Sequence, residues 1–528
     1  MHVHAYTPWG ADGIIIRVEA DIRRGIPGID ITGLAEGAVR EARERVRASF
    51  RNSGFDFPLD RILINLAPAG LRKDGASLDL PIAISVMAAA GMVPVPDRLM
   101  VMGELELSGR LRPVRGVLAA VAAGRSAGIQ EFIVPLENAN EAALLAAPPG
   151  GVCFFAAATL AEAVHALRVR AETGALPENG AAWSDTPESA HRFDIGDFAD
   201  VRGQHRYKRA LEIAAAGGHN ILVFGPPGSG KTMLARRFPA VLPQLSPEEA
   251  VEVSRLHSLA GHIKAAGLIT QPPFRSPHHS ASAEGVLGGG RSVRPGEITL
   301  AHLGTLFLDE APEFRSPVLQ SLREPLEDRL ITIARAEGSL RLPADFQLIL
   351  AANACPCGRL GPAIRSTAGT KEGIGCFCSP DEIRRYWRKL GSALLDRIEL
   401  RVPVCAPGVL APGNTGEEKS AAIAIRVQAA VEIQRERFKA TGIRRNSRMP
   451  PGCIEQFCPI TDKASQAFTL AAAKLGLSGR ACHGILKIAR TIADLEGKDT
   501  LDTAHILEAA QHRRFGDDPY DIIAAGEY

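Results

Sequence analysis

The sequence predicts an α/β protein built from three parts: an α+β N-terminal domain over residues 1–168, an α/β core over 193–403 and a helical C-terminal domain over 404–528. Three observations support this division. The first part mixes short β-branched runs with amphipathic runs of helical period. The second part contains three continuous apolar runs, the pattern of parallel strands that are buried on both faces. From residue 417 onward the apolar spacing is helical.

The composition is that of a folded protein of several domains. At roughly 150 residues per domain, a chain of 528 residues corresponds to about three domains. Its net charge of +2 gives no overall basic field, so any nucleic-acid contact must come from a local patch. The longest apolar stretch, 80–94, is too short for a membrane span and is interrupted by Pro81 and Gly91. Because the N-terminus lacks a basic segment followed by an apolar one, we expect a cytoplasmic protein without membrane contact.

The N-terminal domain shows both kinds of local pattern. Apolar, β-branched residues predict strands over 13–20 and 61–66. Helical spacing predicts helices over 36–50, 139–147 and 157–169. The next residues are mostly polar or small and include several Gly and Pro residues. This composition predicts a linker over 169–192.

A glycine-rich loop follows the first apolar run of the core, 220–224. It fits the pattern G-x-x-x-x-G-K-[ST] and consists of Gly225, Pro226, Pro227, Gly228, Ser229, Gly230, Lys231 and Thr232. Glycines allow backbone N–H groups to wrap phosphates, and the helix expected after the loop adds its positive end. Lys231 would reach the β- and γ-phosphates, and Thr232 would bind Mg²⁺. The alternative interpretation is a chance glycine turn, which the position between strand and helix disfavours.

The other two apolar runs, 304–309 and 346–351, lead to polar residues. Asp309 suits Mg²⁺ coordination at the end of a strand, and Glu310 suits orienting an attacking water. Asn353 follows the third run and could hold the same water. Instead of these roles, the two acids could simply be the solvated end of a strand, and Asn353 could be an ordinary turn residue.

Two closely spaced cysteine pairs come next, Cys355-x-Cys357 and Cys376-x-Cys378. Two thiolate pairs that close a loop predict a tetrahedral structural Zn²⁺ site. The C-x-C spacing is less common than C-x₂-C, and four free thiols are the alternative.

Residues 330–342 alternate about Gly338 and predict a β-hairpin. Further along, helical spacing predicts helices over 420–438, 462–475, 479–496 and 501–512. A local basic stretch follows the first of these helices. It contains Arg435, Arg437, Lys439, Arg444, Arg445 and Arg448. This stretch is a candidate phosphate-contact surface, with a solvated helix end as the equal alternative.

The order of these motifs resembles that of the AAA+ ATPases, and within them the magnesium-chelatase-like branch. The segments that carry the resemblance are 273–279, 288–290, 294–298 and 306–310. The resemblance implies that Arg397 is an arginine finger inserted into a neighbouring subunit, and that Arg480 is the sensor 2 arginine of a helical lid. It also implies that the predicted hairpin is the pre-sensor 1 hairpin, with Arg335 and Arg341 as candidate DNA contacts. Solvated arginines are the alternative for that pair.

The N-terminal domain resembles Lon proteases, which have an S5-like α+β fold. Residues 72–80 resemble the Lon segment that carries the catalytic serine, here Ser77, and 103–118 resemble the segment that carries the lysine base. The position of that lysine is occupied by Leu118, which cannot accept a proton. We therefore expect the fold without proteolysis.

The whole combination resembles the ComM/YifB-like magnesium-chelatase-related ATPases of bacteria. This resemblance implies a hexameric DNA helicase that uses ATP and Mg²⁺ and promotes branch migration while transforming DNA is integrated. Two alternatives share the core: a metal-chelatase motor and a protein-remodelling ATPase. The latter would present an aromatic residue in its pore, for which Phe274 is the evident candidate.

Overall fold

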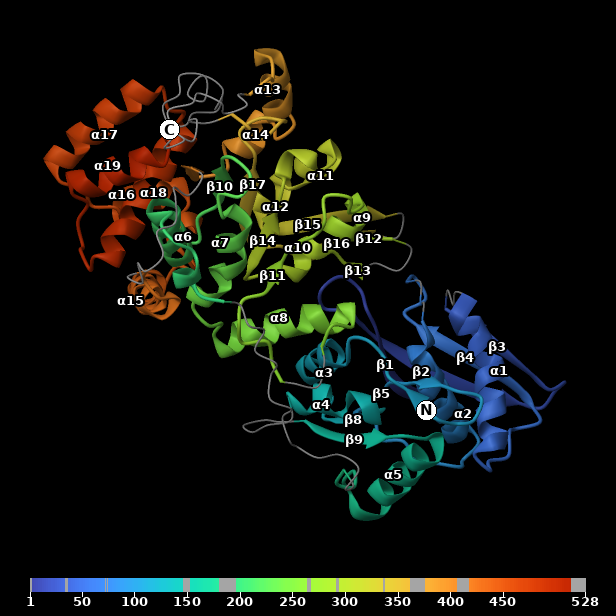
Figure 1. The fold of residues 1–528 in the computed structure, drawn as a ribbon. Coiled ribbons are helices and arrows are strands. Elements are labelled where there is room, and N and C mark those ends of the chain that lie inside the picture. The colour runs from blue at the N-terminus through green and yellow to red at the C-terminus, as the bar shows by residue number, and fades with distance from the viewer. Residues whose placement is uncertain are drawn as a thin grey trace.

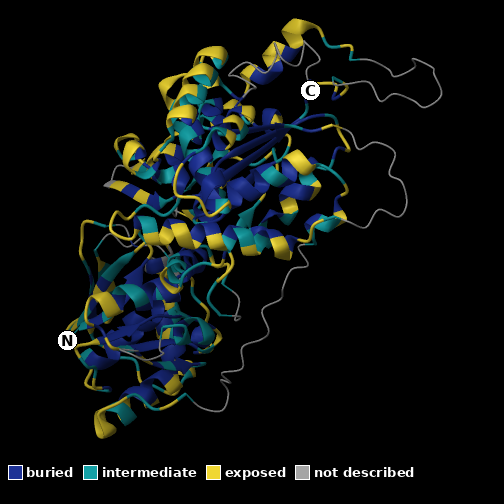
Figure 2. Ribbon diagram, turned by 90° about the vertical axis from the view of Figure 1, so that its left-hand side faces the viewer, coloured by how far each residue is buried: buried dark blue, intermediate teal, exposed yellow. Residues whose placement is uncertain are grey.

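The computed structural model describes residues 2–33, 37–71, 73, 75–145, 152–179, 196–263, 267–290, 294–335, 338–360, 376–405 and 417–513. The N-terminal domain lies at one end of the molecule, the α/β core in the middle and the C-terminal helices at the other end (Figure 1). The buried residues form separate masses in the N-terminal domain and in the rest of the chain (Figure 2).

A mixed sheet is the centre of the N-terminal domain. Its strands are β1 (His2–Thr7), β2 (Ile14–Arg23), β3 (Gly28–Thr32), β4 (Arg61–Ala67), β5 (Leu99–Val101), β8 (Glu131–Pro135) and β9 (Cys153–Ala157). They lie in the order β3-β4-β2-β1-β5-β8-β9. A two-stranded ribbon of β6 (Glu104–Leu105) and β7 (Leu111–Arg112) lies beside it. The domain is therefore α+β, as the sequence predicts.

The helices of this domain are α1 (Gly37–Asn52), α2 (Asp79–Ala89), α3 (Val117–Ser126), α4 (Ala139–Ala143) and α5 (Leu160–Thr173). The apolar stretch that is too short for a membrane span contains α2, whose residues 79–88 are all buried. Pro81 fits there because the first turn of a helix needs no backbone donor. Because α2 is apolar on every side, it is a helix of the central core of this domain.

Several predicted helix boundaries differ from the structure. Residue 157 belongs to β9, and α5 begins later because the Thr159 hydroxyl caps it by accepting from the Glu162 N–H at 3.2 Å. The same helix continues to Thr173, past the predicted start of the linker. Helix α4 ends at Ala143, and residues 146 and 147 of its predicted span lie outside the described residues, as do 180–192 of the linker.

The core is a parallel sheet. Its strands are β10 (Ile221–Phe224), β11 (Phe274–Arg275), β14 (Thr305–Leu308), β17 (Gln347–Ala352) and β18 (Leu400–Pro403). They lie in the order β11-β14-β17-β10-β18, and every neighbouring pair is parallel. The three strands predicted from apolar runs are therefore adjacent, and their carboxyl ends meet at one edge.

Helices cover both faces of this sheet, as continuous apolar strands require. Ile221 and Val223 of β10 face α6 (His205–Gly217) and the C-terminal helices, whereas Leu222 and Phe224 face the other side. The helices on that second side are α9 (Ala283–Leu287), α10 (Glu297–Leu300), α11 (Ser316–Ser321), α12 (Arg323–Asp328), α13 (Pro380–Arg388) and α14 (Ser392–Leu395).

Two hairpins project from the core. The predicted one is formed by β15 (Leu330–Arg335) and β16 (Gly338–Pro343), which pair in antiparallel register from Leu330 opposite Pro343 to Arg335 opposite Gly338. The shorter one joins β12 (Gly288–Gly289) to β13 (Arg294–Pro295).

The C-terminal region is helical, as predicted. Its helices are α15 (Ser420–Phe438), α16 (Ile454–Phe457), α17 (Asp462–Leu475), α18 (Gly479–Leu495) and α19 (Thr503–Gln511). Their apolar faces share one buried cluster with α6 and β10, so this region packs directly on the core. Within the described parts of the chain, no helix is both long enough and apolar enough to cross a membrane.

Helix α8 (Pro247–Ala260) joins the N-terminal domain to the core (Figure 1). Its Leu259 side chain is buried in an apolar cluster of the N-terminal domain, beside α3. The Gly116 N–H donates to the Ser258 carbonyl at 3.1 Å, and the Ser258 hydroxyl donates to the half-buried Glu141 carboxylate. The two domains therefore share a packed and hydrogen-bonded interface.

Candidate nucleotide-binding site and its surroundings

The glycine-rich loop connects β10 to α7 (Lys231–Arg237) through a tight turn. Gly225 has φ 159° and lies against β18, where a Cβ atom would stand 2.1 Å from the Val404 carbonyl oxygen. Gly230 has φ 84°, in the left-handed region that side chains avoid. The pattern of glycines thus has a steric cause in this fold, and it leaves backbone N–H groups free to face a ligand.

The Lys231 ammonium group closes the loop from inside. Its Nζ donates to the carbonyl oxygens of Gly225 and Pro226, each at 2.8 Å, and to Asn353 Oδ1 at 3.3 Å. Burial lowers the pKa of Lys231 to about 8, and the carboxylates of Asp309 and Glu310 oppose that shift. The structure therefore brings Lys231 and Asn353 together, although 122 residues separate them.

Thr232 and Asp309 meet at the carboxyl edge of the sheet. Thr232 Oγ1 donates to Asp309 Oδ2 at 2.8 Å. A hydroxyl and a carboxylate are the hard oxygen ligands that Mg²⁺ prefers, so this pair fits the predicted metal. Glu310 follows in the left-handed conformation with φ 51°, which non-glycine residues seldom adopt and which is enriched at functional sites.

These residues line one pocket of about 450 Å³. The lining consists of Pro227, Gly228, Ser229, Gly230, Lys231, Thr232, Met233, Asp309, Glu310, Ala351, Ala352 and Asn353. An ammonium group, a hydroxyl, two carboxylates and an amide therefore converge beside the loop. This donor set suits a nucleoside triphosphate with Mg²⁺.

The two predicted arginines line a different pocket, of about 460 Å³. Both guanidinium groups bind the Glu327 carboxylate, Arg480 Nη2 at 2.7 Å from Oε1 and Arg397 through the other oxygen. Arg397 Nη1 also donates to the Ala393 carbonyl at 2.7 Å. The hydrogen bond from Arg397 is the main cause that lowers the pKa of Glu327. Neither arginine lines the phosphate-loop pocket of its own chain.

Arg480 is only loosely held, whereas the Arg397 side chain is 16% exposed. The side chains of Arg480 and Glu327 are 45% and 47% exposed, and an ion pair this exposed contributes about 0–1 kcal/mol. Asp396 adds a second carboxylate 3.6 Å from Arg480 Nη1. Glu327 could not be predicted from the sequence, because it is one of three acids, with Glu324 and Asp328, just before the predicted hairpin and belongs to no motif.

The four cysteine sulfur atoms lie within 4.8 Å of one another. Cys355 Sγ is 3.3 Å from Cys357 Sγ and 3.5 Å from Cys376 Sγ. Tetrahedral Zn²⁺ with bonds of about 2.3 Å would place its sulfurs about 3.8 Å apart, so the cluster fits zinc. The Leu360 N–H donates to Cys355 Sγ at 3.3 Å, as expected around a thiolate ligand. Residues 361–375, between the pairs, lie outside the described part of the chain.

The cysteine cluster adjoins the nucleotide pocket. Cys355 comes two residues after Asn353, and Trp387 Nε1 donates to the Ala354 carbonyl between them at 3.1 Å. A Cβ atom at Gly358 would stand 3.1 Å from Pro227 Cδ in the phosphate loop. A metal ion in the cluster would thus hold the segment that carries Asn353.

Comparison with protein-family models matches three segments of the chain. Residues 197–409 match "Magnesium chelatase, subunit ChlI", 18–138 match "Subunit ChlI of Mg-chelatase" and 417–513 match "Magnesium chelatase, subunit ChlI C-terminal". The chain belongs to the magnesium chelatase ChlI-like family. Within this family, the parallel core and its phosphate loop form an AAA+ ATPase module.

Two curated members of the ChlI-like family are similar along nearly their whole length. An uncharacterized protein YifB of Salmonella typhimurium is 40% identical over 521 residues, covering 97% of this chain and 96% of the relative. The competence protein ComM of Haemophilus influenzae is 40% identical over 520 residues, covering 97% of both. A Lon protease of Salinispora arenicola is 29% identical over 136 residues, 24% of this chain and 18% of that protein.

In the described residues of the Lon-like segment, no lysine is free to act as a base. Leu118 is fully buried, and its N–H donates to Glu141 Oε1 at 2.9 Å. Lys73, the first lysine in the chain, is buried and donates to the carbonyls of Gly33, at 2.8 Å, and of Pro68. Ser77 is half-buried, and its carbonyl accepts from the Gly103 N–H at 3.2 Å. The Lys73 ammonium group thus joins two backbone segments through hydrogen bonds and is not free to act as a base.

The hairpin presents Arg341 to solvent, cross-strand from Thr332. Arg335 ends β15, and its side chain lies outside the described residues. The turn between β1 and β2 supports this hairpin, because a Cβ atom at Gly10 would stand 3.3 Å from the Arg341 carbonyl oxygen. Phe274, in contrast, lies in β11 and stacks on Phe307 with ring centres 5.9 Å apart, so it is part of the core.

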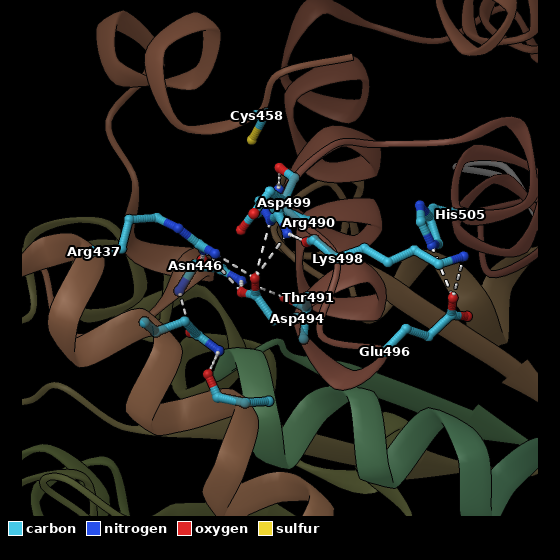
Figure 3. Close-up of polar contacts among 12 residues, drawn as sticks. Arg437, Asn446, Cys458, Arg490, Thr491, Asp494, Glu496, Lys498, Asp499 and His505 are labelled. Carbon is cyan, nitrogen blue, oxygen red and sulfur yellow. Dashed lines mark hydrogen bonds and ion pairs between the residues drawn. The ribbon is translucent and has the colours of Figure 1, made fainter. Parts of the chain in front are cut away.

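Much of the basic stretch is used inside the molecule. Arg444 binds Glu252 at 3.1 Å, Arg448 binds Asp345 at 2.6 Å, and Arg437 Nη1 donates to Asp494 Oδ2 at 2.9 Å. Asp494 is buried, and Figure 3 shows it where Arg437, Asn446 and Arg490 converge. These contacts join the C-terminal helices to one another and to the core. Arg435 and Lys439 remain exposed as candidate phosphate contacts.

Proposed function

We propose that this protein is an ATP-driven motor acting on DNA, a hexameric helicase that promotes branch migration while transforming DNA is integrated. The ATPase part is carried by the 2.8 Å bond from Thr232 Oγ1 to Asp309 Oδ2, beside the buried Lys231 ammonium. The DNA part is supported by the full-length similarity to a competence protein. The exposed hairpin arginine, Arg341, adds a surface for a DNA backbone.

The chemistry follows from the donor set of the pocket. Lys231 binds the β- and γ-phosphates, and Thr232 and Asp309 hold Mg²⁺. Mg²⁺, when bound, neutralises charge that develops on the transferring phosphoryl group. Glu310 orients the attacking water, and Asn353 fixes its position.

Arg397 and Arg480 act on the nucleotide of a neighbouring subunit. They share the Glu327 carboxylate, and neither lines its own phosphate-loop pocket. Arginine suits this task because it stays charged and binds phosphate oxygens in a planar fork. An active site shared between subunits makes hydrolysis depend on assembly, which is why we expect a ring.

The test is an ATPase assay with linear single-stranded DNA, duplex DNA and a four-way junction, with exchange of the junction arms measured in parallel. We expect DNA to stimulate hydrolysis and the arms to exchange only with ATP. Glu310→Gln protein is the control for ATP-dependent exchange. An ATPase indifferent to every DNA would refute the DNA part and favour a chelatase motor or a protein-remodelling motor.

We also propose that the cysteine cluster binds a structural zinc ion. Elemental analysis should find about one zinc per chain, as expected for a single tetrathiolate site. Cys357→Ser should lower this content, whereas Cys153→Ser, at an exposed cysteine of the N-terminal domain, should not. Equal zinc content in both variants would refute the site.

A further inference from the structure

One carboxylate connects the two arginines that lie outside their own nucleotide pocket. Glu327 accepts hydrogen bonds from both Arg397 and Arg480, one on each oxygen. Asp396 lies 3.6 Å from Arg480 and also pairs with Arg513 at 3.4 Å. Glu327 thus occupies the position between two guanidinium groups that a phosphate from another subunit would take. Among the described residues, Arg397 Nε is buried and has no hydrogen-bond partner.

The same carboxylate lies at the root of the hairpin. Glu327 belongs to the last turn of α12, three residues before β15 begins at Leu330. The segment between them is fixed: Arg329 has φ 58°, its carbonyl accepts from the Ala344 N–H at 2.8 Å, and its Nη2 donates to the Arg448 carbonyl at 3.2 Å. A shift of Glu327 would therefore be passed to both strands of the hairpin, because Ala344 directly follows β16.

We infer that Glu327 is a positioning residue that keeps Arg397 and Arg480 in a resting arrangement and links their engagement with a neighbour's nucleotide to the β15–β16 hairpin. This inference rests on the proposed function. The phosphates of a nucleoside triphosphate carry more charge than one carboxylate and bind arginine in bidentate fashion, so they displace Glu327. Glu327, once released, moves the base of the hairpin. In this way one subunit's nucleotide sets the position of its neighbour's hairpin.

The test is Glu327→Gln, which keeps the shape and removes the charge. We expect the DNA-free ATPase rate to rise at least three-fold, because the arginines are no longer held back. The rate with saturating DNA should stay near that of the wild type, so the stimulation ratio falls toward one. Assembly of the variant should need at least three-fold less of a non-hydrolysable ATP analogue. Mass photometry measures this concentration. Wild-type values for both the rate and the assembly midpoint would overturn the inference.

Two controls separate this role from a structural one. Glu324→Gln removes an exposed carboxylate one turn earlier in α12 and should leave rate, stimulation and assembly unchanged. Arg397→Ala should abolish hydrolysis, and adding Glu327→Gln to it should not restore any. A rate increase that survives without Arg397 would overturn the inference, because Glu327 would then act elsewhere.

The proposed function can fail separately. If no DNA stimulates the wild type, the DNA part fails, and the DNA-free rate still decides the role of Glu327. If the wild type hydrolyses no ATP at all, the ATPase part of the proposed function fails. The role of Glu327 is then decided by the analogue concentration at the midpoint of assembly.

Discussion

The phosphate loop and the Lon-like serine segment are equally recognisable in sequence, yet the structure completes only one of them. Thr232 meets Asp309, which lies 77 residues further along the chain. Within the part of the chain that the structure describes, Ser77 meets no lysine base, because Leu118 stands where the lysine belongs and Lys73 is bound to backbone carbonyls. The comparison teaches that a motif predicts chemistry only when the distant group that completes it is present. The four predictions below test that contrast, from the largest expected effect to the smallest.

Removing the completed loop's charge should have the largest effect, because it impairs ATP binding and with it every later step of hydrolysis. Lys231→Ala should weaken ATP binding at least about 30-fold, since losing one partner of a buried charge pair costs about 2–5 kcal/mol. Titration with a fluorescent ATP analogue measures this. Arg236→Ala, which removes an exposed cation from the same helix, is the matched control and should bind normally. Equal affinities for the two variants would show that Lys231 does not contact phosphate.

Removing the carboxylate expected to orient water should separate binding from turnover. Glu310→Gln should bind ATP within about two-fold of the wild type and hydrolyse it about 10²–10⁴ times more slowly, the usual contribution of general acid–base catalysis. A single-turnover assay measures the chemical step. Glu313→Gln alters a nearby acid that pairs with Lys389 at 3.7 Å and should keep full turnover. Brisk hydrolysis by the Glu310→Gln variant would show that another group orients the attacking water.

Raising the pH from 7 to 9 should weaken ATP binding about ten-fold. Burial lowers the pKa of Lys231 to about 8 in the nucleotide-free protein. Phosphates favour the charged ammonium, so binding above that pH must take up a proton, and affinity is constant below it and falls above it. Calorimetry in two buffers of different ionisation enthalpy measures both the affinity and the proton uptake. No uptake at pH 9 would mean that Lys231 is already charged.

The smallest effect is expected in the Lon-like segment. Ser77→Ala should change neither ATPase rate nor DNA stimulation, and the wild type should cleave no casein. The reason is that Leu118 cannot take a proton from Ser77. Casein cleavage that Ser77→Ala abolishes would show that another residue serves as the base, and it would remove the contrast between the two regions.

The convergence of Lys231, Thr232, Asp309 and Asn353 on one pocket could be predicted because each of them follows a strand of the parallel sheet or begins the helix after the phosphate loop. Asp309 and Asn353 follow apolar runs, and parallel strands bring such ends to one edge. The pairing of Arg480 with Glu327 could not be predicted, because it depends on where the C-terminal helices pack. That packing rests on contacts such as Arg437 with Asp494, between residues 57 positions apart. Boundaries failed for a local reason: Thr159 caps α5, and apolar spacing alone extended the helix into β9.

Helix α8 has a consequence for the evolution of this architecture. Its first turns belong to the core, whereas Leu259 and Ser258 near its end are packed and hydrogen-bonded into the N-terminal domain. A lineage that lost the N-terminal domain would expose Leu259 to water, and the Glu141 contact of Ser258 would vanish with the domain. The two domains can therefore be exchanged between proteins only together with the end of this helix.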